Sequence, residues 1–182
     1  MKKVDLSKFN NDWYNPGPKI KIFAWLLISV LFFENSFFTS IKVKRFLLRL
    51  FGCRLGLGLI IKPNVKIKYP WKLYIGNNCW LGEYCWIDNL AEVTLENNVC
   101  ISQGAYLLCG NHDFTKTAFD LMIKPIKIRN GAWVGAKSVV CPGVILNEFS
   151  ILSVSSIATS NLEAYGIYQG NPAEKIKTRV IY

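Results

Sequence analysis

The chain has 182 residues and a hydrophobic fraction of 51%, which is enough for one domain with a substantial core. It holds one histidine and six cysteines without any Cys-x-x-Cys pair, so we expect no zinc site and no other bound metal.

The net charge of +10 is unevenly distributed along the chain. Residues 1–60 carry ten basic and three acidic residues, a net charge of +7, and residues 61–125 carry six of each kind, a net charge of zero. Residues 126–182 carry six basic and three acidic residues, a net charge of +3. Basic ends suit the phosphates of a cofactor, anionic lipid or nucleic acid, although ordinary solubility charge explains much of the +3.

Residues 1–19 form a polar and aromatic arm that ends in Asn15-Pro16-Gly17-Pro18. Asp12, Trp13 and Tyr14 within it have two interpretations. They line a sugar site, because aromatic faces suit sugar rings, or they pack the arm onto the body of the protein. Packing is the preferred interpretation.

Two apolar segments follow the arm. Residues 20–33 are mostly apolar but fall short of the roughly 20 residues that a membrane-spanning helix needs. Residues 41–51 combine four basic side chains with a wide apolar face, as in helices that lie on an anionic membrane surface. The alternative is that both segments pack as helices on the rest of the chain or on a neighbouring subunit, and for residues 20–51 both interpretations stay open.

A six-residue repeat dominates the segment from Leu73 to Thr159. Its aliphatic positions are Ile75, Leu81, Ile87 and Val93, then Leu95, Ile101 and Leu107 after a two-residue slip, then Ile128, Val134, Val140, Leu146, Leu152 and Ala158. Small or aliphatic residues stand two positions before most of these, as Cys79, Cys85, Ala105, Ala132, Ser138 and Ser156 do. A period of six fits neither a helix nor a hairpin strand, and predicts a solenoid in which each unit is a short strand plus a corner. Residues two apart share one side of a strand and so fill the interior together.

Residues 109–125 interrupt this repeat. An insertion in a solenoid maps to a loop on one face, often the binding face, and the only histidine, His112, lies in this one. We therefore expect an arm with apolar and basic helices in residues 1–54, a β-solenoid in 55–160 with the loop 109–125, and a basic tail in 161–182.

Several motifs resemble one family along nearly the whole chain. They are Val99-Cys-Ile-Ser-Gln-Gly-Ala-Tyr106, Gly110-Asn-His-Asp113, Gly131-Ala-Trp-Val-Gly-Ala-Lys137, Val140-Cys-Pro-Gly-Val144 and Tyr168-Gln-Gly-Asn-Pro-Ala173, together with Val4–Phe9 and Ile67–Trp71. The chain resembles the colanic acid biosynthesis acetyltransferases, which O-acetylate sugars of bacterial exopolysaccharides and lie near the galactoside and maltose acetyltransferases. The resemblance implies a left-handed parallel β-helix, a homotrimer, and acetyl-CoA bound as co-substrate between neighbouring β-helices.

Acetyl transfer to a hydroxyl needs a base, and His112 is the candidate. Its position in the insertion and in the family's Asn-His-Asp motif supports this role. Asp113 either orients the imidazole or caps a turn, and Asn111 is expected to contact the acceptor or the thioester. Cys109 offers a rival route through an acyl-cysteine, but the resemblance points to direct transfer in a ternary complex.

The resemblance also implies the residues that bind the two substrates. The amide of Ala136 is the expected oxyanion donor on the cofactor side, where Val154 and Thr159 also match family positions. The family's lysine after that threonine is Ser160 here, which removes a possible phosphate contact, and its usual glycine is Ser155. Lys175, Lys177 and Arg179 remain as the expected phosphate partners, or else belong to a solvated tail. Asp88 and Asn89, one coil before the loop, are expected to approach His112 from the neighbouring subunit as acceptor-site residues, or else to satisfy their own corner.

We thus expect an acetyl-CoA-dependent sugar O-acetyltransferase, with a non-catalytic trimeric scaffold as the alternative. The acceptor in such pathways is lipid-linked, which gives residues 20–51 a reason to contact the membrane. The apolar run starts too late for a signal peptide, so we expect a cytoplasmic protein with reduced thiols, peripheral on the inner face of the cytoplasmic membrane. Nucleic-acid binding is not expected, because the N-terminal lysines are interleaved with apolar residues and no binding module accompanies them.

Overall fold

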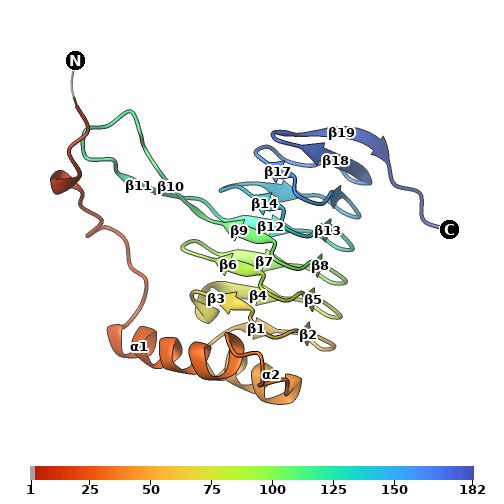
Figure 1. Cartoon of the computed structure of the whole chain (residues 1–182), viewed down its shortest axis with the longest axis horizontal. Coiled ribbons are helices and arrows are strands. Elements are labelled where there is room, and N and C mark those ends of the chain that lie inside the picture. Colours follow the sequence, from red (N-terminus) through yellow and green to blue (C-terminus); the bar gives the residue numbers. More distant parts are fainter. Residues whose placement is uncertain (1–2) are drawn as a thin grey trace.

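The computed structural model describes residues 3–182 and shows a stack of parallel β-coils with two helices beyond its first coil (Figure 1). Three sheets run along the stack. Sheet A holds β1 (Arg54–Leu55), β4 (Leu73–Ile75), β7 (Val93–Leu95), β12 (Ile126–Ile128) and β15 (Ile145–Leu146). Sheet B holds β2 (Ile60–Ile61), β5 (Trp80–Leu81), β8 (Cys100–Ile101), β13 (Trp133–Val134), β16 (Ile151–Leu152), β18 (Gly166–Gly170) and β19 (Ala173–Thr178). Sheet C holds β3 (Lys66–Ile67), β6 (Trp86–Asp88), β9 (Tyr106–Leu108), β14 (Val139–Val140) and β17 (Ile157–Ala158).

The six-residue repeat sets the register of these sheets. Each aliphatic position pairs with its counterpart on the next coil, for example Leu81 with Ile101 and Ile101 with Val134. All thirteen aliphatic positions of the repeat are buried, and so are the small residues before them except Ala91, which is partly exposed. The parallel β-helix that the repeat predicts is confirmed, and its interior is a single column of apolar side chains.

The corners between strands require unusual backbone angles. Asn64, Asn78 and Asn98 adopt positive φ there, as asparagine tolerates. Ser155 does so as well, with φ of 55°. This backbone angle explains why a glycine would suit the position better than serine.

Replacing Ser155 with glycine is therefore expected to stabilise the protein. Relief of the left-handed strain, about 1–2 kcal/mol, exceeds the added entropy of the unfolded chain, about 0.4–1 kcal/mol. The melting temperature should rise by about 2 °C in a thermal unfolding scan. The matched control is Ser153→Gly. The φ angle of Ser153 is not positive, so glycine there should lower the melting temperature.

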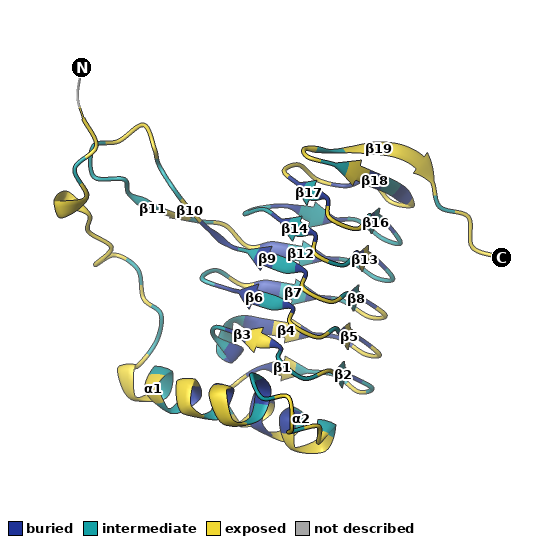
Figure 2. Cartoon of the chain, in the orientation of Figure 1, coloured by how far each residue is buried: buried dark blue, intermediate teal, exposed yellow. Residues whose placement is uncertain are grey.

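The N-terminal segments cover the first coils. The arm holds the short helix η1 (Leu6–Lys8), then α1 (Lys19–Ile28) continues into a π-helical turn η2 (Ser29–Phe33), and α2 (Ile41–Leu50) follows. The inner faces of the helices are buried and their outer faces exposed (Figure 2). Trp25 donates its indole N–H to the Ile67 carbonyl at 2.7 Å, and Lys44 donates to the Lys62 carbonyl at 3.2 Å. These contacts confirm the expected helical segment and seat it on the solenoid.

The last coil ends in a hairpin. Residues 161–182, which the sequence pattern separates from the repeat, still contribute β18 as a parallel neighbour of β16. β19 then turns back antiparallel on β18 and ends sheet B. Arg179 fixes the following segment by donating to the Gly131 carbonyl at 3.0 Å and the Phe149 carbonyl at 3.3 Å. Its guanidinium therefore binds the backbone of the solenoid, and Arg179 does not line the groove in which a phosphate partner was expected.

Candidate active site

The insertion folds as a hairpin that projects from the stack beside the N-terminal arm (Figure 1). Its strands are β10 (Gly110–His112) and β11 (Leu121–Ile123), paired antiparallel with His112 opposite Leu121. Gly110 permits the exit from the coil, since a Cβ there would lie 2.5 Å from Leu90 Cδ1. The arm joins the hairpin through a hydrogen bond from the Asp5 amide to the Thr117 carbonyl at 2.9 Å.

The hairpin holds the imidazole of His112 in one orientation. Nδ1 lies 2.8 Å from the Phe119 carbonyl, and a carbonyl only accepts, so Nδ1 carries the proton. The ring stacks on Phe119 with centroids 4.5 Å apart and planes inclined by 8°. The Phe9 ring of the arm lies 5.7 Å away. In the neutral imidazole, Nε2 is therefore the nitrogen that can accept a proton.

The two neighbours of His112 do not contact its ring nitrogens. Asp113 accepts hydrogen bonds from the amide and hydroxyl of Thr115 at 3.0 and 2.6 Å, and these bonds lower its pKa from the usual value. Asn111 is exposed and accepts from the His112 amide at 2.8 Å. The local backbone, rather than the Asp113 carboxylate, orients the imidazole.

Phe119 is the residue of this site that sequence reasoning missed. It adopts φ of 54°, which is strained for a bulky side chain, and this conformation accompanies the carbonyl contact with His112. Its position in an irregular insertion gives no periodic pattern from which the contact could be predicted.

A cleft of about 570 Å³ opens beside His112. Its lining comes from the arm, the first coils and the hairpin, and consists of Phe9, Asn11, Asp12, Tyr14, Pro16, Lys68, Tyr69, Leu90, His112 and Leu121. Tyr14 packs the arm by donating its hydroxyl to the Leu90 carbonyl at 2.9 Å, while Trp13 is exposed and absent from the lining. The arm therefore packs on the body, and its Asp12 and Tyr14 also line the cleft; a sugar site there stays a prediction.

Asp88 and Asn89 do not line this cleft, but they contact Lys68 and Tyr69 of the same chain, which do. The Asp88 carboxylate is 2.9 Å from the Lys68 ammonium and accepts from the Tyr106 hydroxyl at 3.2 Å. Asn89 is fully buried and bonds both backbone groups of Tyr69, at 2.9 and 2.6 Å. Asp88 therefore positions a lysine of the cleft, and Asn89 fixes the backbone of a second lining residue.

Cys109, at the base of the hairpin, is fully buried. Burial raises the pKa of its thiol to about 12, so little thiolate exists at neutral pH. This environment disfavours an acyl-cysteine.

Replacement of Cys109 by alanine is accordingly expected to leave kcat within about threefold of wild type, because no step passes through the sulfur. Steady-state acetyl transfer is the measurement, and mass spectrometry of the enzyme mixed with acetyl-CoA should detect no acetylated Cys109. A loss of activity at unchanged fold, or an acetylated Cys109, would contradict direct transfer.

A second depression of about 500 Å³ lies on sheet B, where β13 and β16 turn toward sheet C. Ala136, Val154 and Lys177 all line this groove, together with Ser102, Gln103, Trp133, Gly135, Ile151, Leu152, Ser153, Ile167, Gln169 and Ile176. Gly135 is required there, since a Cβ would lie 2.7 Å from the Leu152 carbonyl oxygen of the next coil. The amides of Gln103, Ala136 and Val154 donate to no residue among 3–182. The groove lining thus includes three residues whose backbone amides have no acceptor among residues 3–182.

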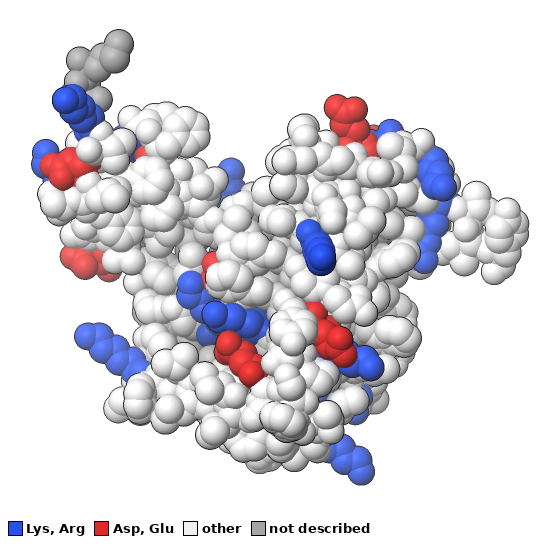
Figure 3. Space-filling view, viewed as in Figure 1, with Lys and Arg blue, Asp and Glu red and all other residues white. Residues whose placement is uncertain are grey.

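Two expected cofactor residues lie elsewhere. Thr159 is exposed after β17 in sheet C and does not line the groove. Lys175 forms an ion pair with Glu163 at 2.7 Å, and the groove lining holds Lys177 but not Lys175. On the face seen in Figure 3, basic side chains are interspersed with acidic ones.

The cleft at His112 and the groove at Ala136 share no lining residue. The hairpin leaves the stack after β9 and re-enters at β12, whereas the groove follows the turns after β8, β13 and β16 (Figure 1). One chain therefore carries His112 and the amides of the groove at different corners of the solenoid.

Comparisons with known proteins agree with this architecture. No family model matches the chain. It is 34% identical over 177 residues to a protein of Escherichia coli (strain K12) named as the colanic acid biosynthesis acetyltransferase WcaF, covering 97% of each chain. The hexapeptide-repeat acetyltransferase VCA0836 of Vibrio cholerae superposes with a TM-score of 0.79 at 17% identity, over 88% of this chain and 91% of that one. A galactoside acetyltransferase solved in complex with coenzyme A gives 0.76 at 22% identity, over 87% and 80%.

The coiled solenoid with its projecting hairpin is the fold of the hexapeptide-repeat acetyltransferases. Within that class, the identity along the whole length decides the assignment. The chain belongs to the family of colanic acid biosynthesis acetyltransferases, and it is an acetyltransferase enzyme.

Proposed function

We propose that the protein transfers an acetyl group from acetyl-CoA to a hydroxyl of a sugar in bacterial exopolysaccharide biosynthesis. The observation that carries the proposal is the Nδ1 contact of His112 with the Phe119 carbonyl, which leaves Nε2 as a base at a polar cleft. The name of the Escherichia coli relative supports the pathway, and the coenzyme A complex of the galactoside acetyltransferase supports the donor.

The proposed reaction is a direct transfer. His112 Nε2 takes the proton of the sugar hydroxyl as the oxygen attacks the thioester carbonyl. The oxyanion of the tetrahedral intermediate accepts a hydrogen bond from the Ala136 amide. The carbon–sulfur bond then breaks, and the imidazolium returns the proton to the departing thiolate, giving the acetyl ester and free CoA. Lys177 is placed to bind a phosphate of CoA, with Lys175 nearby on the same strand.

A homotrimer completes this site in our proposal. His112 and the amides of the groove lie at different corners of one chain, so a neighbouring copy must bring its groove to the cleft. A ring of copies with identical head-to-tail contacts meets this need, and the straight faces of a solenoid can pack in that way.

Membrane contact through residues 20–51 is the last part of the proposal. Among residues 3–182, no helix is long and apolar enough to cross a membrane. Yet α1 and η2 expose an apolar strip of Ile20, Phe23, Leu26, Leu27, Val30 and Leu31, and α2 exposes Lys42 and Arg49. An exposed apolar strip beside basic side chains suits peripheral binding to anionic lipid.

The test of this contact is sedimentation with vesicles of phosphatidylglycerol and phosphatidylcholine. Phe23→Glu combined with Leu27→Glu should lower the bound fraction several-fold, and phosphatidylcholine vesicles should bind little of either protein. Equal sedimentation of variant and wild type would refute the contact.

The acceptor is sought by measuring CoA thiol release from acetyl-CoA with a panel of glycosides and lipid-linked sugars. Release that requires an acceptor establishes the transferase reaction. If CoA binds and none of these sugars supports release, the proposed sugar acceptor is wrong.

A further inference from the structure

A third depression, which we call the hollow, lies on the outer face of β2, β5 and β8 in sheet B and has a volume of about 250 Å³. Its shape follows from the sizes of the side chains on neighbouring strands. Cys100 pairs with Trp80 on one side and with Trp133 on the other. A small side chain between two indoles leaves an open space, which Ile60 borders at the end of the sheet. No step proposed above uses this space.

The walls of the hollow are chiefly apolar. Trp80 and Trp133 are both exposed, and the Trp133 indole is held in place by donating its N–H to the Ser102 hydroxyl at 2.8 Å. Among residues 3–182, Lys62 is the one charged side chain in the lining. A concave surface with large apolar side chains and few charges suits a hydrocarbon group.

The hollow continues the groove that contains Ala136. Ser102, Gln103 and Trp133 line both, so the two spaces meet at the turn after β8. The strand order of sheet B gives the direction: Lys177 lies on β19, Ala136 follows β13, and the hollow covers β8, β5 and β2 beyond it. In the proposed donor site, the CoA phosphate lies at Lys177 and the thioester carbonyl at Ala136. The acyl substituent leaves the carbonyl carbon on the side opposite the sulfur, so it extends toward the hollow.

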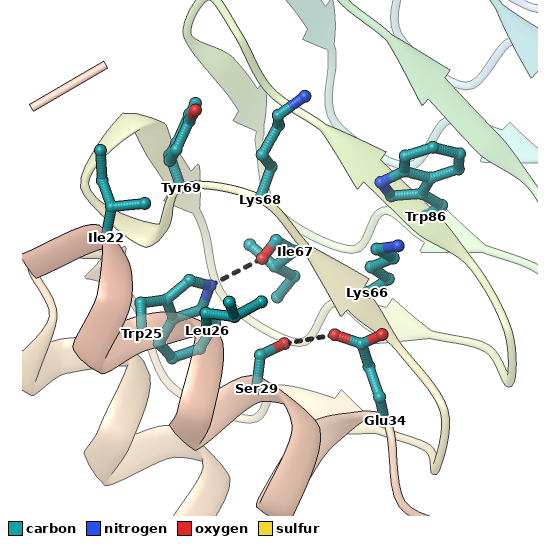
Figure 4. A pocket seen from close by; sticks show the side chains of 10 residues that line it. All are labelled: Ile22, Trp25, Leu26, Ser29, Glu34, Lys66, Ile67, Lys68, Tyr69 and Trp86. Carbon is teal, nitrogen blue, oxygen red and sulfur yellow. Dashed lines mark hydrogen bonds between the residues drawn. The ribbon is translucent and has the colours of Figure 1, made fainter. Parts of the chain in front are cut away.

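Another apolar pocket does not meet this condition. It lies between α1 and η2 on one side and β3 and β6 on the other, around Trp25, Leu26 and Trp86 (Figure 4). Of residues 3–182, none lines both this pocket and the groove or the hollow. On one chain, the groove therefore continues into the hollow and not into this pocket.

We infer that the protein also transfers acyl groups longer than acetyl, such as butyryl and hexanoyl, with the hydrocarbon chain of the acyl-CoA bound in the hollow. Parallel strands lie about 4.8 Å apart, so β2 is roughly 10 Å beyond β8, which leaves room for several methylene groups. The sugar oxygen bonds to the carbonyl carbon, the carbon–sulfur bond breaks, and the proton passes through His112 to the CoA thiolate. The products are the longer acyl ester and free CoA. This inference rests on the proposed function and extends its donor class.

The test compares the binding of S-hexyl-CoA and S-methyl-CoA by isothermal titration calorimetry. Both thioethers are unreactive and need no acceptor. The hexyl probe should bind about tenfold more tightly or better, because each methylene that leaves water is worth roughly fourfold in affinity. Cys100→Phe fills the space between the two tryptophans and should abolish this preference. It should leave S-methyl-CoA binding within about twofold of wild type, since Cys100 does not line the groove.

Thr94→Phe is the matched control. Thr94 lies on β7 of sheet A in the same coil, between Tyr74 and Lys127 on the neighbouring strands, and it lines neither the groove nor the hollow. The preference for the hexyl probe should persist in that variant. Hexanoyl-CoA should also release CoA thiol with an acceptor that accepts acetyl, and Cys100→Phe should lower this rate about tenfold relative to the rate with acetyl-CoA.

Three results would overturn the inference: equal binding of the two thioethers by the wild type, equal weakening of both in Cys100→Phe, or loss of the preference in Thr94→Phe. Thermal unfolding of each variant separates these results from misfolding. Equal binding of the two thioethers would leave the acetyltransferase proposal standing, because CoA would still occupy the groove. Failure of both thioethers to bind would contradict the donor groove itself, and with it the proposed function.

Discussion

Alanine in place of His112 is expected to lower kcat for acetyl transfer by about 10³-fold, within the range that a positioned general base contributes. The loss should fall on kcat, since the imidazole accepts a proton and makes no contact with the groove at Ala136. The dissociation constant for acetyl-CoA should stay unchanged. Stopped-flow or steady-state release of CoA thiol measures kcat, and calorimetric titration with acetyl-CoA measures the dissociation constant.

Phe119→Ala serves as the companion variant. It removes the ring stacked on the imidazole but keeps the backbone carbonyl that fixes Nδ1. We expect about a tenfold loss of kcat at similar KM, well short of the His112 effect. Equal activity of His112→Ala and wild type would remove His112 as the base.

Proline in place of Ala136 is expected to lower kcat by about 100-fold or more, because it deletes one oxyanion donor. The corner itself should tolerate proline. Ala136 precedes Lys137, whose φ is 57°, and the chain already places Pro63 before Asn64 and Pro142 before Gly143, both at positive φ. The Ala136 amide has no partner among residues 3–182, so no internal hydrogen bond is lost.

Glu83→Pro is the matched control for this substitution. Glu83 precedes Tyr84, whose φ is 59°, at an equivalent corner outside the groove lining. Activity should persist in that variant, and both variants should melt near wild type. An active Ala136→Pro enzyme would show that the oxyanion donor lies elsewhere.

The solenoid was predictable because its information is local and repeated. The position of a residue within each six-residue unit indicates whether its side chain faces the interior. Leu81, Ile101 and Val134 could therefore be assigned to one face from the sequence alone. The repeat also indicates that Ala136 and Val154 lie at corners, whereas their place on the cofactor side was implied only by the family resemblance. The position of His112 in an insertion was equally visible.

The orientation of His112 was not predictable, because the insertion has no period. Asp113 was a reasonable candidate for orienting the imidazole by adjacency, but strand alternation turns neighbouring side chains to opposite faces. The contact with the Phe119 carbonyl depends on one strained φ angle that no side-chain pattern encodes. The cleft depends on the arm, whose packing involves residues more than 70 positions apart, such as Tyr14 and Leu90.

The central claim is that the base and the oxyanion donor of one active site come from neighbouring copies of the chain. It is tested by co-expressing His112→Ala and Ala136→Pro chains with different affinity tags and purifying the mixed oligomers. Each parent alone should be nearly inactive. Every mixed trimer has one interface in three that pairs an intact base with an intact groove, so the purified mixed trimers should regain about a third of the wild-type kcat. Mixed oligomers no more active than the parents would contradict a shared site and place both groups within a single chain.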